Sequence, residues 1–105
     1  MRNGMGRQSR DKGARTERAI VRLLQDRGFA AEKVSRMYKP GEDISVPLLG
    51  RDLLVEVKCR GDGFKQLYDW IEGNDALIVK SDRREPLLIV RLSFGAEVAS
   101  KAEGL

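Results

Sequence analysis

Apolar positions recur at helical spacing in two stretches of this 105-residue chain. The first stretch runs from about Gly13 to Arg27, and Gly28 is placed to end it. The second runs from Phe64 to Ile71, before a stop at residues 73–74, and Trp70 belongs to its apolar stripe. The pattern predicts two helices, and it favours Trp70 in the core over the alternative, a platform on which a base stacks.

Short runs rich in apolar residues predict strands between and after these helices. Five strands are expected: Phe29–Met37, Asp43–Val46, Asp52–Arg60, Ala76–Val79 and Leu87–Leu92. The first is polar enough for a sheet edge, and the fourth is apolar enough to be buried. A Pro-Gly turn within residues 38–42 precedes the second strand, which Pro47 closes. Ser93–Leu105 is weakly helical and is expected to fray.

The third predicted strand carries charged residues among apolar ones. Side chains alternate along a strand, which puts Leu53, Val55, Val57 and Cys59 on one face and Leu54, Glu56 and Lys58 on the other. A carboxylate beside an ammonium on an apolar strand costs desolvation free energy unless the two pair, bind a metal or face solvent. The Glu-x-Lys spacing also arises by chance, so an exposed ion pair on an edge strand is the alternative.

The order of these elements predicts the fold class. The second and third strands form a β-hairpin with Asp43 on one arm and Glu56 on the other, in a register that the sequence does not fix. A helix-bearing crossover to the fourth strand is long enough for a parallel pair. We therefore expect an α/β fold with a central mixed β-sheet flanked by helices. Residues 1–11 are expected to form a flexible basic arm, and residues 12–105 a single domain.

Composition excludes several kinds of chemistry. The chain has no His, which excludes His-based acid–base catalysis, Ser-His-Asp triads and His-containing zinc sites. Its single Cys excludes an internal disulfide and a Cys-x-x-Cys metal site. No run suits a membrane span or a secretory signal, so a cytoplasmic location is expected. Hydrolysis would have to use carboxylates, lysine and a hard cation such as Mg²⁺.

Positive charge is concentrated in the first quarter of the chain, within a net charge of +4. A polyanion such as DNA is the natural partner, because neutralising phosphates releases counterions. The alternative is a basic arm that only improves solubility. Arg15, Arg18 and Arg22 form an outer stripe on the first helix, which either follows a phosphate backbone or is simply solvated.

Glu17 is the unusual residue of the first helix. Ile20, Val21 and Leu24 follow it at helical spacing, so Glu17 continues the stripe that faces the sheet. A carboxylate aimed at the sheet suggests a functional role. Alternatively, Glu17 lies at the rim of the first turn, where the helix dipole favours a carboxylate.

Glu17, Asp43 after a Pro-Gly turn, and Glu56-Val57-Lys58 together resemble the PD-(D/E)xK nuclease superfamily. Within it, residues 12–18, 23–30, 43–44 and 55–58 look like the archaeal-type Holliday junction resolvases. The match spans residues 12–93. The stretch between Phe29 and Asp43 is longer than in those resolvases, and residues 37–41 replace their serine- and glycine-containing loop.

The resemblance implies a restriction-endonuclease-like nuclease domain over residues 12–105. In it, Asp43, Glu56 and the backbone carbonyl of Val57 would hold Mg²⁺, for which Mn²⁺ is expected to substitute. Lys58 would orient or activate the attacking water, or stabilise the charged phosphate, and Glu17 would complete the metal shell directly or through water. The family also implies a homodimer that acts on branched or junction DNA.

The residues expected to contact nucleic acid are Lys12, Arg15, Arg18, Arg22, Lys39, Arg60 and Gln66. The leading hypothesis is a Mg²⁺-dependent, structure-selective DNA endonuclease of the resolvase type. One alternative is a nuclease with another DNA substrate, such as a nicking or phage DNA-processing enzyme. Others are a basic nucleic-acid-binding domain without catalysis, and a domain in which every acid is an ordinary surface residue.

Overall fold

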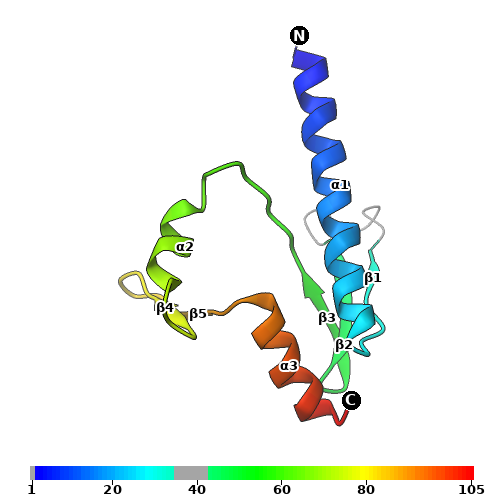
Figure 1. The fold of residues 1–105 in the computed structure, drawn as a ribbon, viewed down its shortest axis with the longest axis vertical. Coiled ribbons are helices and arrows are strands. Elements are labelled where there is room, and N and C mark those ends of the chain that lie inside the picture. The colour runs from blue at the N-terminus through cyan, green and yellow to red at the C-terminus, as the bar shows by residue number, and fades with distance from the viewer. Residues whose placement is uncertain (1, 35–42) are drawn as a thin grey trace.

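The computed structural model describes residues 2–34 and 43–105, and the side chains from residue 12 onward within those ranges. Its elements are α1 (Arg2–Asp26), β1 (Glu32–Lys33), β2 (Ile44–Leu48), β3 (Arg51–Val55), α2 (Lys65–Ile71), β4 (Leu77–Val79), β5 (Leu87–Ile89) and α3 (Leu92–Glu103) (Figure 1). The described part is a small α/β protein with one three-stranded and one two-stranded sheet, and both are antiparallel.

The three-stranded sheet, in the order β1-β2-β3, contains the predicted hairpin. Leu49 and Gly50 join β2 to β3, both with positive φ (58° and 77°), as a tight hairpin turn requires. Pro47 lies inside β2 and does not close it. It is tolerated there because β1 pairs with β2 only at Ile44 and Ser45, so no β1 residue needs a hydrogen bond from Pro47.

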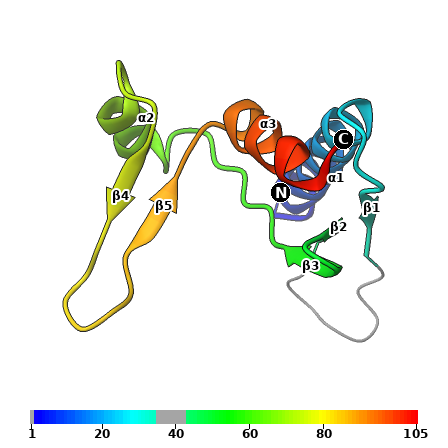
Figure 2. The ribbon, with the colours of Figure 1, turned by 90° about the horizontal axis from the view of Figure 1, so that it is seen from below.

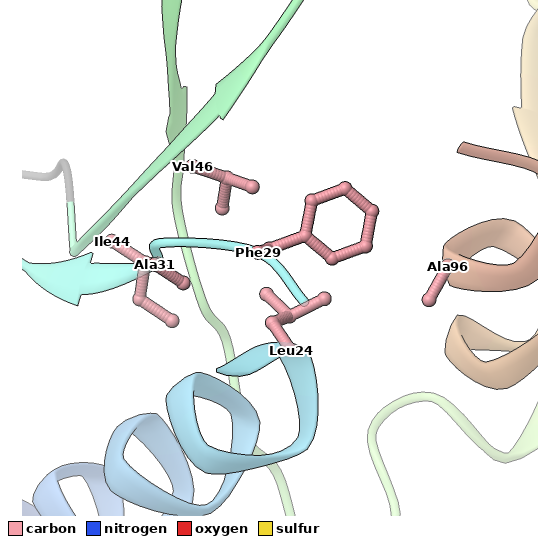
Figure 3. Close-up of a cluster of buried hydrophobic side chains, with 6 residues drawn as sticks. All are labelled: Leu24, Phe29, Ala31, Ile44, Val46 and Ala96. Atoms are coloured by element: carbon pink, nitrogen blue, oxygen red, sulfur yellow. The ribbon is translucent and has the colours of Figure 1, made fainter. Parts of the chain in front are cut away.

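The buried core joins this sheet to two helices. Its residues are Leu24, Phe29, Ala31, Ile44, Val46 and Ala96 (Figure 3). Leu24 comes from α1, Ile44 and Val46 from β2, and Ala96 from α3. Ile44 is completely buried, with 0% of its surface exposed. The core therefore fixes α1 and α3 against the central strand β2.

Both ends of the chain are more helical than the sequence predicted. α1 begins at Arg2 and not near Gly13, so residues expected to form a flexible arm belong to the helix. The C-terminal segment is the helix α3 and not a fraying tail, because Ala96 packs into the core. Gly104, with φ 73°, ends α3 in the left-handed conformation, and its N–H bonds back to the last turn.

The expected single mixed sheet is wrong, because the described chain contains no parallel strand pair. β4 pairs with β5 across the turn of residues 80–86. The backbone hydrogen bonds of these two apolar strands are therefore made locally, and β4 does not pair with β3. α2, β4 and β5 lie on the other side of α3 from α1 and the three-stranded sheet (Figures 1 and 2). α2, the β2–β3 hairpin and the edge position of the first strand are confirmed. Of the expected strand Phe29–Met37, β1 covers only Glu32–Lys33, and residues 35–37 and the predicted Pro-Gly turn lie outside the described residues.

Burial of the second half was also predicted wrongly. Trp70 is 53% exposed and Ile78 is 67% exposed, although both were expected in the core. Ile71 is the buried residue of α2. No helix in the part of the chain described is long and apolar enough to cross a membrane.

We predict that Ile44→Ala lowers the free energy of unfolding by about 2–5 kcal/mol, because it leaves a cavity at the centre of the core. The matched control is Leu54→Ala on the same hairpin, whose side chain is half-exposed and whose loss should cost below about 1 kcal/mol. Urea unfolding followed by circular dichroism measures both. Equal losses would contradict the position of the core.

Candidate active site

Asp43 is the most constrained acidic residue of the site. It is 3% exposed and immediately precedes β2. The Val34 N–H donates to its backbone carbonyl, and its own N–H donates to the Val55 carbonyl, both at 3.0 Å. The Val57 N–H donates to its carboxylate Oδ2 at 2.6 Å. Because a buried carboxylate requires such partners, these bonds fix Asp43 at the point where β1, β2 and β3 meet.

The pairing of the hairpin changes at Asp43. Ile44 is the register partner of Val55, and the Asp43 N–H also bonds to Val55, so two residues of one strand oppose one of the other, as in a β-bulge. Beyond this point the Val57 N–H bonds to a side chain and not to the backbone of β2. β3 therefore ends at Val55, and the strand expected to reach Arg60 is wrong in its last part.

Residues 56–60 nevertheless keep the predicted alternation of exposure. Val57 and Cys59 are half-buried, whereas Glu56, Lys58 and Arg60 are exposed. Val57 packs against the core, which turns its charged neighbours outward. Glu56 lies between the two residues that Asp43 binds, so the structure brings these two predicted site residues together.

Glu56 and Lys58 form a loose ion pair in solvent. Lys58 Nζ lies 3.9 Å from Glu56 Oε2, and about half of each side chain is exposed (55% and 48%). An exposed pair at this distance contributes little to stability, so both groups can turn toward a ligand at small cost.

Glu17 faces inward, as its spacing predicted. It is 8% exposed, and because α1 begins at Arg2 it lies in the middle of the helix, where the dipole of the first turn does not act. Lys33 Nζ lies 3.4 Å from Glu17 Oε1. Lys33 is the register partner of Ile44, the residue after Asp43, so this lysine adjoins the site. No signal in the sequence pointed to Lys33, because its place depends on the β1–β2 register.

The acidic residues supply part of a cation site. Among the side chains that the structure describes, from residues 12–34 and 43–105, no group of at least three Asp, Glu, His or Cys is arranged to hold a metal ion. Asp43 is bonded to the two residues on either side of Glu56, and Mg²⁺ typically takes one or two carboxylates from a protein and keeps several waters. The donor chemistry of this pair fits Mg²⁺, whereas Glu17 is not brought into a three-carboxylate cluster.

A cavity of about 470 Å³ adjoins Lys58, between α1 and the start of α2. Lys58, Arg60, Lys65 and one carboxylate, Asp62, line it together with Thr16 and Tyr68. The Lys65 ammonium also pairs with Asp69 at 2.8 Å. The Thr16 hydroxyl donates to the Lys12 carbonyl at 2.9 Å, and its oxygen lies 3.6 Å from Cys59 Sγ, so α1 contacts this segment here. Thr16, Lys65 and Tyr68 are site candidates that the sequence did not identify, because α1 and α2 meet here only in the folded chain.

The expected DNA-contacting residues fall into separate groups. Lys12, Arg15, Arg18 and Arg22 are exposed on α1, as is Gln66 on α2, and none of them lines the cavity. The arginines occupy the side of α1 away from the inward stripe of Glu17 and Leu24. Arg60 lines the cavity and its guanidinium donates to the Cys59 carbonyl at 2.9 Å. Lys39 lies outside the described residues.

No protein-family model, curated protein or solved structure matches this chain. The relation to the PD-(D/E)xK nucleases therefore stays a prediction from the residues quoted above.

We predict that Asp43→Ala speeds hydrogen exchange of the Val57 amide about tenfold or more, because a hydrogen bond to a charged group contributes roughly 1.5–3 kcal/mol. Asp43→Asn is the matched control, since its side-chain oxygen can still accept the bond, and it should leave Val57 close to wild type. Exchange measured by NMR tests this. An unchanged rate in Asp43→Ala would show that the carboxylate does not hold residue 57.

Proposed function

We propose that this chain is a Mg²⁺-dependent DNA endonuclease of the PD-(D/E)xK type, which hydrolyses phosphodiester bonds in branched DNA such as a four-way junction. One observation carries the proposal. The carboxylate of buried Asp43 accepts a hydrogen bond from the Val57 N–H at 2.6 Å. Exposed Glu56 and Lys58, on either side of Val57, therefore lie at the open end of the hairpin, opposite its turn. An acid, a second acid and a lysine at one strand end are the residue types that metal-assisted hydrolysis requires.

Asp43, Glu56 and the Val57 carbonyl are the groups that would hold Mg²⁺. When bound, the ion would neutralise phosphate charge and favour ionisation of its water. Lys58 would add an ammonium at the same phosphate, and it can leave its loose pair with Glu56 to do so. Asp43 itself cannot move far, because its backbone and side chain are both hydrogen-bonded. Asp43 would therefore fix the position of the metal ion, while the exposed side chains of Glu56 and Lys58 would move to meet the ion and the phosphate.

The positive groups beside the site support DNA as the substrate. Lys58, Arg60 and Lys65 line one cavity next to Glu56, where a phosphate backbone would be neutralised close to the proposed point of cleavage. The exposed arginines of α1 lie on another side of that helix, so they would contact DNA away from the scissile phosphate.

The Lys33–Glu17 ion pair favours a second candidate, a nucleic-acid-binding domain without catalysis. A glutamate already neutralised by lysine at 3.4 Å is less suited to complete a metal shell. In a binding domain of this kind the same basic residues would bind DNA, and the carboxylates would only stabilise the folded structure.

Cleavage of labelled DNA distinguishes the two candidates. We predict metal-dependent nicking of a four-way junction with Mg²⁺, none with EDTA, and a loss of at least about 100-fold in Asp43→Asn and Glu56→Ala, since each removes a proposed metal ligand. Binding should persist or tighten in both variants, because a negative charge near phosphate is removed.

Asp52→Asn is the matched control for these variants, because Asp52 is an exposed aspartate on the same hairpin, away from the site. It should cleave like wild type. Linear duplex, flap and single-stranded DNA run in parallel define the substrate. Tight binding without cleavage of any substrate would reject the nuclease and leave the binding domain.

Replacing Arg15, Arg18 and Arg22 together by Gln should weaken DNA binding and flatten its dependence on log salt concentration by about 0.9 for each arginine that contacts a phosphate. A matched control replaces Lys80, Arg83 and Arg84, which are three exposed cations around the β4–β5 turn. Binding measured by fluorescence anisotropy across salt concentrations checks both. Equal slopes in the two triple variants would assign the α1 arginines to solvent.

A further inference from the structure

The cavity beside Lys58 has apolar surface as well as charge. Its volume of about 470 Å³ lies in the range of roughly 300–1,000 Å³ that is typical of sites for small ligands. Ile20, Val57 and Phe64 line it, and each is only half-buried, so part of each apolar side chain remains accessible. A phosphate gains nothing from an apolar wall. The cavity therefore suits a ligand that carries an apolar group as well as a charge.

Tyr68 adds an aromatic ring to this cavity. It projects from α2 with 73% of its surface exposed, so folding leaves most of the ring in water. An exposed aromatic ring beside positive charge is the usual platform on which a nucleic-acid base stacks, and every base offers a flat face for such stacking. The ring therefore suits a base that has left the stack of a double helix.

The charged groups around the cavity are of both signs. Arg60 and Lys65 supply cations, and Asp62 supplies a carboxylate. The Lys65 ammonium lies 2.8 Å from the carboxylate of Asp69, which does not line the cavity and reduces the positive charge that Lys65 offers. The Asp62 carboxylate repels phosphate, but it can accept a hydrogen bond from the amino group of cytosine, adenine or guanine. This mixture fits a whole nucleotide better than a phosphate alone.

We propose that the cavity binds one unpaired nucleotide of the DNA next to the cleaved phosphate, with its base stacked on Tyr68 and its phosphate near Arg60. An intact duplex keeps its bases stacked inside, so none of them reaches the cavity. Extruding a base costs least free energy when the base has no pairing partner. The cavity therefore selects DNA with unpaired nucleotides, as in a bulge, a flap or an incompletely paired branch. This inference rests on the proposed function for the identity of the ligand.

The test measures binding of fluorescently labelled DNA by anisotropy in EDTA, where the proposed cleavage does not occur. The probes are a duplex with one bulged nucleotide, the same duplex fully paired, and the same bulge with its base removed. Wild type should bind the first at least about tenfold more tightly than the other two, because only the first supplies a base that can stack on Tyr68. The abasic probe tests this point in the wild-type protein, without relying on the folding of a variant.

The variants then assign the preference to one residue. Tyr68→Ala should bind the bulged and the paired duplex about equally, whereas Tyr68→Phe keeps the ring and should keep the preference. The matched control is Trp70→Ala, because Trp70 is a 53% exposed aromatic residue of the same helix that does not line the cavity. It should keep the preference as well. Both aromatic side chains are exposed, so circular dichroism should be unchanged in every variant.

Three results would overturn the proposal. They are equal wild-type affinity for bulged and paired DNA, a preference that survives removal of the base, and a preference that Tyr68→Ala retains or Trp70→Ala loses equally. Cleavage with Mg²⁺ is measured separately, so the two proposals fail in different ways. Cutting without any preference for the bulge would keep the nuclease and reject the nucleotide site. A base-dependent preference without cutting would keep the nucleotide site and reject the nuclease.

Discussion

The position of Asp43 is the constraint on which the first half of the structure depends. Its backbone connects the residue after β1 to the end of β3, and its carboxylate holds the Val57 N–H at 2.6 Å. A carboxylate with 3% exposure is stable only with such bonds, so the bulge, the end of β3 and the outward turn of Glu56 and Lys58 follow from one residue. At Asp43 the fold and the proposed chemistry use the same carboxylate.

Signals that act over a few residues predicted much of this structure. Helical spacing located α2 and the inward face of Glu17, and two consecutive short apolar runs located the hairpin. The site was predicted as residue types and not as a geometry. The bulge at Asp43 depends on a bond between a side chain and a distant amide, and the Lys33–Glu17 contact depends on which residues of β1 and β2 face each other. Neither leaves a periodic trace in the sequence.

The prediction of which residues are buried in the second half of the chain failed for a different physical reason. Trp70, Ile78 and Leu88 are exposed, because an apolar pattern does not say whether another part of the same chain reaches those residues. α3 shows the opposite case. Its sequence is only weakly helical, yet Ala96 reaches the core beside Phe29, and packing makes a regular helix of a segment that local propensity would leave frayed.

Pro47 limits the addition of a further strand to the three-stranded sheet, and the β4–β5 sheet has no such residue. β2 extends beyond its partner β1, and an open stretch of strand normally offers backbone N–H groups to any passing chain. Pro47 has no N–H, so no further strand can form a regular ladder along this stretch. The β4–β5 ribbon contains no proline and no charge within its strands. Uncontrolled strand addition is thus discouraged along the open stretch of β2, whereas neither strand of the ribbon carries such a block.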